Sequence, residues 1–399
     1  MKRSTTATPQ QLALATTGDG TATLAFSVLQ GPQELAALQA DWAALYGGCP
    51  DRRFCLCPDW GARMWARAAA RLGRRPLVIV GRDAEGCRLV WPLVVYRQRL
   101  WRVVQPMSED LSDFDDILVA AHPDADRWRS DAWALMLRTV RPDMVVCRRV
   151  PAGSGLDRLL GEAAGAWQRE SASPYVDFRR FDGWDGYYRS LSRKTRSTNR
   201  NRRNRLERFG PLAFVEVSEP AAAEALIGWM FREKHRRLGA RAHSRQEKTT
   251  HAQFGADLPF LQDAATTAFR GGQMRLFRLS AGAATVAVMS GLVAERRLIG
   301  WLYAYDPAFL SGGPGRVLLL ESLRWAQQAG FDTVDFMPDP EPYKAEWTDK
   351  AYGVRDVRLA TSAWGRVLVT WYRSPLRGLL IALYMRLPRP MQAVIRRAA

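Results

Sequence analysis

The sequence has no apolar stretch long enough to cross a membrane. Its longest lipid-like run, Gly378–Met385, has eight residues, whereas a membrane-spanning helix needs about 20. The chain starts with Lys2 and Arg3 nearby but lacks the apolar core of a secretory signal, with only the short segment Leu12–Ala15. We therefore expect neither a transmembrane protein nor a secreted one.

Cysteine and histidine are also scarce. The five cysteines all precede residue 150 and none forms a Cys-x-x-Cys pair, which predicts reduced, buried thiols in a cytoplasmic protein. The four histidines show no metal-binding spacing such as His-Glu-x-x-His, and His243 and His251 are eight residues apart. No metal is expected to take part in the function.

Lysine is rare, whereas arginine is abundant. The chain of 399 residues has six lysines among 58 basic residues, against 40 acidic residues, and its formal net charge is +18. Either a solvated, arginine-rich surface or attraction to a polyanion explains this charge; the polyanion would be nucleic acid, the phosphates of coenzyme A, an anionic glycan or a membrane surface. The hydrophobic share of 47% and the 15 tryptophans predict a globular chain with room for two domains.

The alternation of apolar and polar segments predicts a mixed α/β fold. Residues 274–305 have the pattern of three short strands separated by turns. A glycine-rich loop at 311–316, a helix at 317–329 and a strand at 332–337 follow. A weaker form of the same order in residues 24–150 indicates a tandem duplication of one unit.

These patterns divide the chain into four segments. We expect a disordered tail, an N-terminal domain, a C-terminal domain with the functional site, and an amphipathic basic tail, at residues 1–23, 24–170, 171–365 and 366–399 respectively. Local patterns further predict a polar surface loop at 240–256 and helices at 155–169, 184–209 and 259–270.

The loop at 311–316 has the chemistry of a diphosphate site. Glycines let backbone amides approach a ligand, a helix N-terminus adds partial positive charge, and an arginine adds a full charge. The residues expected to bind the phosphorylated ligand are Gly312, Gly313, Gly315 and Arg316. The loop is neither a P-loop nor a Gly-x-Gly-x-x-Gly motif, and an ordinary turn is the alternative.

Short motifs around this loop resemble the GNAT acyltransferase superfamily and, within it, the FemAB-like, CelD (BcsL)-type acetyltransferase branch. They are Tyr305-Asp306-Pro307, Pro314-Gly315-Arg316, Asp335-Phe336, and Glu341-Pro342-Tyr343-Lys344 followed by Trp347. The resemblance implies two tandem GNAT-like domains, each a twisted mixed sheet flanked by helices, with acetyl-CoA or another acyl-CoA as co-substrate. The sequence departs from the family at Met337–Pro340, where a glycine is common.

The resemblance also implies roles for individual side chains, with the acyl group between the ends of two neighbouring strands. The residues expected to be catalytic are Asp335, Glu341 (general base), Tyr343 (proton donor) and Lys344 (counter-charge to an anionic group). Those expected to contact the acceptor are Asp306 and Trp347. Structural roles are the alternative: a strand end, core aromatic residues or a surface ion pair.

Two charged segments add further candidates for acceptor binding. The acidic loop at 109–116 contains Asp113, which the resemblance places in the cleft, although a solvated loop is the alternative. The helix expected at 193–208 is dense in basic residues, and Arg196 and Arg200 are expected to border the acceptor channel or to bind a polyanion. A solvated basic helix explains the same pattern.

The resemblance, together with the chemistry of the loop at 311–316, implies an acyl-CoA-dependent N- or O-acyltransferase that acts on an amine or on a sugar or polysaccharide precursor by direct acyl transfer. One alternative is a FemAB-like enzyme that uses aminoacyl-tRNA, so tRNA is a candidate partner. Another is a non-catalytic polyanion-binding protein. The C-terminal tail mixes apolar and basic residues, and a peripheral membrane contact is an alternative to its docking on the domain.

Overall fold

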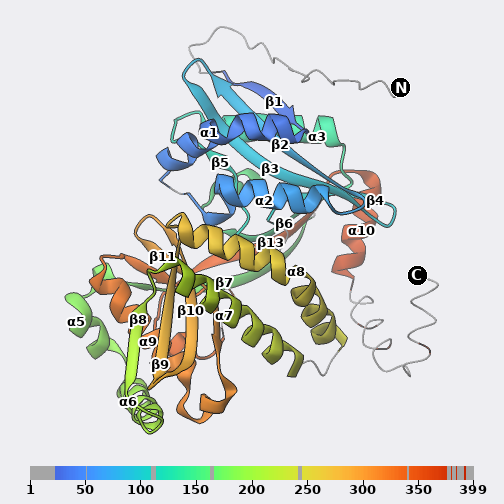
Figure 1. The fold of residues 1–399 in the computed structure, drawn as a ribbon. Helices are drawn as coiled ribbons and strands as arrows, with labels where there is room; N and C mark the ends of the chain where they lie inside the picture. Colours follow the sequence, from blue (N-terminus) through green and yellow to red (C-terminus); the bar gives the residue numbers. More distant parts are fainter. Residues whose placement is uncertain are drawn as a thin grey trace. The chain divides into compact units, whose positions relative to one another are not determined.

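The computed structural model describes residues 23–50, 52–108, 114–161, 166–240, 245–338 and 341–374, together with residues 379, 383 and 391. Within these residues the chain forms two compact units (Figure 1). The first comprises the described parts of Met1–Asp51, Cys55–Glu170 and Arg355–Ala399, and the second comprises those of Arg52–Phe54 and Ser171–Val354.

The first unit is built on a mixed sheet with the strand order β1-β2-β3-β4-β6, and β5 pairs with β3. Its strands are β1 (Ala25–Leu29), β2 (Arg74–Asp83), β3 (Gly86–Gln98), β4 (Trp101–Pro106), β5 (Leu118–Val119) and β6 (Met144–Pro151). The pair β4 and β6 is parallel, whereas β1–β2, β2–β3, β3–β4 and β3–β5 are antiparallel. Every residue of Leu77–Gly81 in β2 is buried because helices cover both faces of the sheet.

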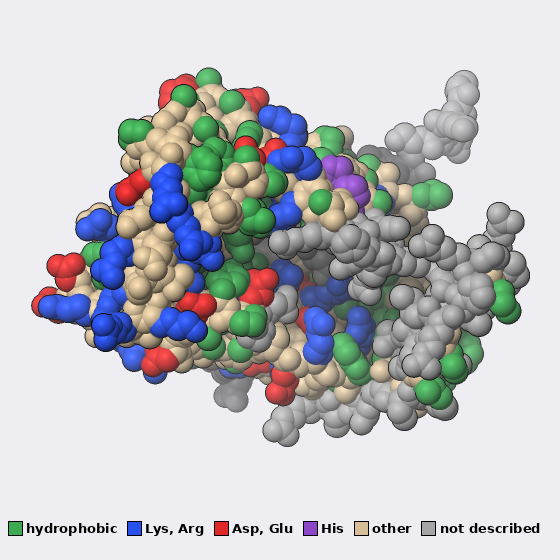
Figure 2. Space-filling view, turned by 90° about the horizontal axis from the view of Figure 1, so that it is seen from below, with side chains coloured by type: hydrophobic (Ala, Val, Ile, Leu, Met, Phe, Trp, Pro, Cys, Tyr) green, Lys and Arg blue, Asp and Glu red, His purple; other side chains and the backbone are tan. Residues whose placement is uncertain are grey.

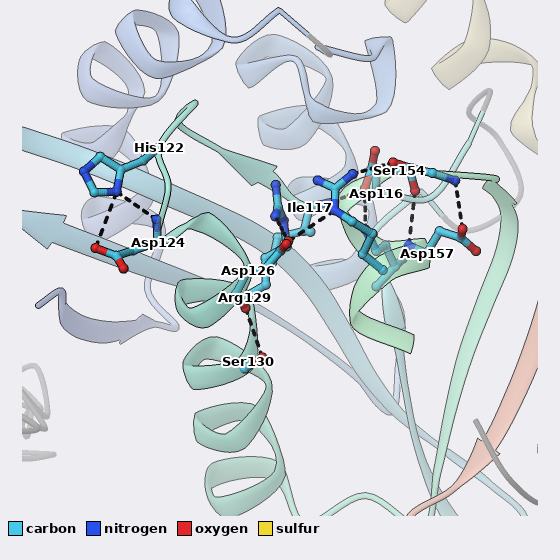
Figure 3. A network of polar contacts seen from close by, with 12 residues as sticks. Asp116, Ile117, His122, Asp124, Asp126, Arg129, Ser130, Ser154 and Asp157 are labelled. Atoms are coloured by element: carbon cyan, nitrogen blue, oxygen red, sulfur yellow. Dashed lines mark hydrogen bonds and ion pairs between the residues drawn. The ribbon is translucent and has the colours of Figure 1, made fainter. Parts of the chain in front are cut away.

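Four helices surround this sheet: α1 (Pro32–Gly48), α2 (Pro58–Ala69), α3 (Ala125–Val140) and α4 (Gly155–Leu160). A polar network fixes the ends of α3 and α4 beside β5 (Figure 3). The buried Asp116 carboxylate accepts hydrogen bonds from the amides of Ile117 and Leu156, each at 2.9 Å. Arg129 donates to Asp126, and burial lowers the pKa of the Arg129 guanidinium.

The second unit contains a sheet with the order β7-β12-β11-β10-β9-β8. Its strands are β7 (Trp167–Asp177), which begins in the first unit, β8 (Leu212–Glu216), β9 (Met274–Ala281), β10 (Ala284–Ala294), β11 (Arg297–Tyr305) and β12 (Thr333–Asp335). Only β11 and β12 pair in parallel among the neighbours whose register is known. The meander, helix and strand predicted between residues 274 and 337 are confirmed.

The helices of the second unit are α5 (Gly183–Ser190), α6 (Arg193–Glu207), α7 (Pro220–Ala240), α8 (Arg245–Arg270) and α9 (Pro314–Gln328), with short 3₁₀ turns η3 (Pro307–Gly312) and η4 (Lys344–Glu346). Helix α9 packs on the sheet through Val317 and Leu318, in a core that includes Met289 of β10. Helix α6 contacts α9 and η3, whereas α7 contacts β11 and β10 (Figure 1). The predicted fold class, a mixed α/β protein with helices flanking its sheets, is confirmed.

Three of the local predictions are wrong in part. Residues 245–256 are helical and not a loop, because α7 and α8 pack together and the rings of His235 and His251 stack with centroids 4.1 Å apart. The helix expected at 184–209 is two helices, since the Ser192 hydroxyl caps the start of α6 by accepting the amide of Thr195. The helix expected at 155–169 ends at Leu160, and β7 follows.

After the second unit the chain continues through β13 (Ala351–Ala360), which begins in that unit and ends in the first, to α10 (Ala363–Arg373). Leu368 and Val369 bury one side of α10, while Trp364 and Trp371 stay exposed. Most of the predicted basic tail lies outside the described residues. Within the part of the chain that is described, no helix combines the length and apolar character needed to cross a membrane.

Candidate functional site

A cavity of about 260 Å³ lies in the second unit between the N-terminus of α9, the second half of β11 and the segment after β12. Its walls are mainly apolar and aromatic, as is typical of small-molecule sites. The lining residues include Met289, Gly300, Tyr303, Tyr305, Gly313, Gly315, Arg316, Phe336, Tyr343 and Trp347. The cavity therefore brings together the glycine-rich turn and the segment that the sequence analysis singled out.

The cavity opens where β11 and β12 separate. The two strands pair only from Arg297 to Ile299, opposite Thr333 to Asp335. Beyond this point the chain after β12 turns toward β7, and the amide of Phe336 donates to the carbonyl of Pro174. We call the point where β11 and β12 diverge the fork. Gly300 lies at this fork, and a Cβ atom on it would lie 3.4 Å from the carbonyl oxygen of Asp335.

The pairing of β10 with β11 also shifts at this point. Gly291 lies opposite Gly300 and Ser290 lies opposite Leu302, so Trp301 is an extra residue in β11. A bulge of this kind bends a strand and re-aims its side chains. The fork and the bulge together leave room for a ligand beside Tyr303 and Tyr305.

The three glycines of the turn have different surroundings. A Cβ atom on Gly312 would lie 2.3 Å from Leu206 of α6, so this glycine permits close packing. Gly313 has φ +61°, a left-handed conformation that glycine adopts without strain. A Cβ atom on Gly315 would meet nothing closer than Tyr305 at 3.7 Å, so it would project into the cavity.

The turn offers one backbone amide to the cavity. The amide of Gly313 donates to Leu310, the amide of Arg316 donates to Gly313, and Pro314 has none. No described residue accepts from the amide of Gly315. This amide stands in the first turn of a 15-residue helix, where partial positive charge favours an anion.

Side chains from three segments hold Arg316. Its Nε donates to Oδ1 of Asn199 in α6 at 2.5 Å, and its Nη1 lies 2.8 Å from Oε2 of Glu346. The guanidinium carbon lies 5.0 Å from the ring centroid of Trp347, within the range of a cation–π contact. Arg316 is thus oriented toward α6 and η4 even though it borders the cavity.

Two hydroxyl groups lie together at the cavity. The hydroxyls of Tyr303 and Tyr343 are 3.2 Å apart, and Glu341, two residues before Tyr343, is exposed. Burial, with help from Tyr303 and Glu341, raises the pKa of Tyr343 well above its ordinary value. Tyr343 therefore keeps its proton at neutral pH and can donate or relay it.

Asp335 is fully buried and lies outside the group of described residues that line the cavity. Its Oδ1 accepts hydrogen bonds from Ser173 and from the amide of Met337, both at 2.8 Å. The hydroxyl of Tyr352 donates to its Oδ2, and burial together with this carboxylate raises the pKa of Tyr352. The observed contacts of Asp335 hold β7, β12 and β13 in register.

Lys344 is 4% exposed, and its ammonium donates to the carbonyls of Met337 at 3.0 Å and Pro338 at 3.2 Å. Met337 has a φ of +65°, which is unusual for a residue with a side chain. The ammonium therefore helps to fix the strained turn that positions Phe336 at the cavity.

Of the remaining predicted site residues, those that the structure describes do not line the cavity. Asp306 caps η3 by accepting the amide of Ala308 at 2.9 Å. Arg196 donates to the carbonyls of Arg189 and Leu191 at the end of α5, at 2.5 and 2.6 Å. Arg200 is exposed on α6, and Asp113 lies outside the described residues.

Helix α6 has a strongly basic outer face (Figure 2). Its packed side carries Thr195, Asn199 and Leu206, all buried. The exposed basic residues at and just after this helix are Arg193, Lys194, Arg200, Arg205 and Arg208. At 3.6 residues per turn these positions fall within an arc of about 140°, so the helix presents one positive face.

A second cavity of about 680 Å³ lies on the other side of Trp347, which borders both cavities. It is more polar, and Lys194, Thr195 and Glu346 are among its lining residues. The two cavities thus share a wall. Within the described residues, no cluster of three or more His, Cys, Asp or Glu side chains is placed to hold a metal ion.

Several residues that define this site were not predicted from the sequence. Tyr303 borders the cavity beside Tyr343, and Arg237 of α7 lies 4.8 Å from the ring centroid of Tyr305. The alternating aromatics Trp301, Tyr303 and Tyr305 were the available signal, since alternate residues of a strand share a face. The role of Asn199 in orienting Arg316 had no such signal.

One protein-family model matches this region of the chain. Residues 193–345 match the model of the acetyltransferase (GNAT) domain. None of the curated proteins matches the chain. The matched segment runs from the start of α6 into η4 and includes every residue named above as lining the first cavity except Trp347.

Several solved structures are similar at low identity. The C-terminal domain of a putative lysylphosphatidylglycerol synthetase from Agrobacterium fabrum is 11% identical, with a TM-score of 0.49, and the match covers 84% of this chain and 95% of that one. FemX is 12% identical, with a TM-score of 0.43 and coverage of 80% and 95%. A tandem GNAT protein from the clavulanic acid biosynthesis pathway is 13% identical, with a TM-score of 0.39 and coverage of 84% and 98%.

Proposed function

Because residues 193–345 form an acetyltransferase (GNAT) domain, we propose that the protein is an acyltransferase that binds an acyl-CoA, with acetyl-CoA as the simplest case, in the first cavity of its second unit. The acyl group passes directly to an amine or hydroxyl group of an acceptor, which is an amine or a sugar or polysaccharide precursor. No covalent intermediate on the protein is part of this proposal.

One observation carries the proposal: the cavity runs from the unpaired amide of Gly315 at the start of α9 to the fork between β11 and β12. An amide at a helix N-terminus suits a phosphate oxygen. The apolar walls suit the uncharged arm of coenzyme A, and the fork lies where an acyl group would reach. The residues present therefore fit this co-substrate.

The chain's own groups supply orientation and a proton route. An acyl-CoA would bring an activated thioester, so the protein needs to position the acceptor and move one proton. Tyr303 and Tyr343 lie side by side at the cavity, and the nearby exposed Glu341 contributes to the raised pKa of Tyr343. We assign Glu341 as the base that takes the proton from the attacking amine or hydroxyl group, and the protonated Tyr343 as proton donor to the leaving thiolate. The proton held by Glu341 then passes to Tyr343 and restores its hydroxyl group.

The direct test is isothermal titration calorimetry of the full chain with acetyl-CoA, with pantetheine as control. We expect saturable binding of acetyl-CoA and much weaker binding of pantetheine, because pantetheine lacks the diphosphate. Equal binding of the two would remove the diphosphate role of the turn, and no binding of either would refute the proposal.

The basic face of α6 favours a second candidate, an aminoacyl-tRNA-dependent transferase. Dense like charge on one helix face is typical of a surface that binds a polyanion. Titration with charged and uncharged tRNA at two salt concentrations separates the candidates. Tight, salt-sensitive tRNA binding without acetyl-CoA binding would favour the second candidate.

A further inference from the structure

The first unit exposes large apolar side chains in three segments. Leu72 follows α2, Leu100 lies in the turn between β3 and β4, and α10 exposes Trp364, Val367 and Trp371. We call these five residues the apolar patch. The other large apolar residues that are exposed in the described part of this unit follow α10 in the sequence: Leu379, Leu383 and Met391. Exposed apolar residues that lie together mark an interaction surface.

The three segments lie at one end of the first sheet (Figure 1). The start of β2 pairs with the end of β3, so the loop with Leu72 and the turn with Leu100 leave the sheet at the same end. The indole Nε1 of Trp101 donates to the carbonyl of Trp364 at 3.1 Å, and the two rings have centroids 6.2 Å apart. These contacts hold α10 beside the turn between β3 and β4.

Helix α10 has apolar side chains on two sides. Leu368 and Val369 are buried in the core of the first unit. Trp364, Val367 and Trp371 recur at intervals of three and four residues and therefore share a face, and each is between 43% and 54% exposed. A helix on the surface of a globular protein normally has one apolar stripe, which it buries. The second, exposed stripe therefore indicates a surface that a partner covers.

Arginines without acidic partners border the apolar patch. Arg97 and Arg99 flank the tip of the turn and Arg366 lies on α10; all three are exposed, and none has an acidic partner among the described residues. The carboxylate of Asp143, at the start of α10, already accepts hydrogen bonds from within this unit. Residues 357–399 contain eight arginines and neither aspartate nor glutamate. The charge around the patch thus complements an anionic surface.

We propose that the apolar patch binds the surface of an anionic lipid membrane. Tryptophan suits this surface because its ring is apolar and its N–H is polar. Arginine pairs with lipid phosphates through two parallel hydrogen bonds. A nucleic acid would use the arginines but gives no role to the exposed Leu100 and Val367. The contact is peripheral, since no described helix could cross the membrane, and it does not depend on the proposed function.

The experiment measures sedimentation of the full chain with lipid vesicles. One set of vesicles contains phosphatidylcholine alone, and the other contains phosphatidylcholine mixed with phosphatidylglycerol. We expect binding to the mixed vesicles that weakens as salt is added, because salt screens exposed charges. Binding to phosphatidylcholine alone should be much weaker. A wild-type chain that does not bind the mixed vesicles at low salt would overturn the proposal.

A matched pair of valine variants tests the apolar contribution. Val367→Ser should weaken binding to the mixed vesicles about fivefold, because an exposed valine gains free energy when lipid covers it. Val215→Ser is the control, since Val215 is exposed on β8 of the second unit, outside the patch. Adding Leu100→Ser to Val367→Ser should raise the loss to about 20-fold. All three side chains are exposed, so the melting temperatures should match that of the wild type.

A matched pair of charge variants tests the arginines. Replacing Arg97, Arg99 and Arg366 together by glutamine should weaken binding more than about tenfold, since each basic residue near an anionic membrane contributes about fivefold. The control removes the same charge from α6 by replacing Arg193, Arg205 and Arg208 with glutamine, and it should change binding little. Equal losses in both charge variants, or in both valine variants, would overturn the proposal. Loss of binding in the charge variant alone, with wild-type binding by Val367→Ser, would overturn it too.

A third measurement reports insertion directly. Lipids brominated on their acyl chains quench nearby indoles, so they should quench part of the tryptophan fluorescence of the wild type. The quenched part should fall in Trp371→Phe, which keeps an apolar ring at the same position. Absence of quenching would contradict insertion of the patch. A dimer in the absence of vesicles that Val367→Ser separates would assign the patch to a second copy of the chain and overturn the proposal.

Discussion

Gly312 and Gly315 belong to one turn, yet replacing each by alanine should damage different properties. In Gly312→Ala the new Cβ would lie 2.3 Å from Cδ2 and 2.7 Å from Cγ of Leu206, a fully buried side chain. In Gly315→Ala the nearest atom, on Tyr305, is 3.7 Å away. The first change therefore overfills a packed contact, whereas the second places a methyl group in the cavity.

The expected magnitudes follow from these distances. Overpacking of a core contact costs about 2 kcal/mol, which lowers the melting temperature of a unit of this size by about 4–8 °C. Gly315→Ala should leave stability unchanged or raise it slightly, since alanine favours a helix by up to about 1 kcal/mol over glycine. It should weaken acetyl-CoA binding about 10- to 100-fold, because a hydrogen bond to a charged group contributes about 1.5–3 kcal/mol.

Calorimetry and thermal denaturation of each variant measure both properties. Gly48→Ala is the control, since its Cβ would meet nothing within 4 Å at the end of α1. In a Leu206→Ala background the cost of Gly312→Ala should nearly vanish. The reasoning is refuted if Gly315→Ala binds acetyl-CoA like the wild type, or if Gly312→Ala costs the same with and without Leu206.

Three further predictions concern the relay, the buried lysine and a thiol. Tyr343→Phe should lower kcat about 100-fold with an unchanged acetyl-CoA Kd, and unchanged turnover would dismiss the relay. Lys344→Met should leave the Met337 carbonyl without its hydrogen-bond donor and lower the free energy of unfolding by about 2 kcal/mol, as measured by denaturant unfolding. A variant as stable as the wild type would contradict this contact. Burial raises the pKa of Cys87 to about 11, so its alkylation rate should keep rising with pH up to about that value, whereas a plateau near pH 9 would contradict the burial.

Much of the secondary structure of the second unit was predictable because the sequence patterns that indicate it are local. The meander of β9, β10 and β11, the glycine turn and α9 each follow from the periodicity of a few consecutive residues. Residues 245–256 were predicted wrongly because their polar composition resembles a loop, while packing against α7 makes them helical. Ser192 was also not recognised from local sequence as a helix start: its capping hydroxyl divides residues 184–209, which have the pattern of one continuous helix, into α5 and α6.

The candidate site shows more clearly that contacts between distant segments cannot be predicted from local sequence. The sequence placed Arg316 beside a phosphorylated ligand, but its partner Asn199 lies 117 residues away, and only their contact shows which way the guanidinium points. Asp335 and Lys344 were expected to be catalytic, and their observed contacts are with Ser173, Tyr352 and two backbone carbonyls. Charge and motif do not reveal whether a side chain faces a cavity or the core.

The sequence by itself determined the meander of β9, β10 and β11, the glycine turn and α9, and the match of residues 193–345 to the acetyltransferase (GNAT) domain, because periodicity, turns and short motifs are properties of neighbouring residues. Only the tertiary structure decided that Gly312 packs against α6 while Gly315 faces the cavity, and that Tyr303 lies beside Tyr343. Those facts depend on contacts between segments far apart in the chain. Such contacts form only when the helices and the sheet close around a common core.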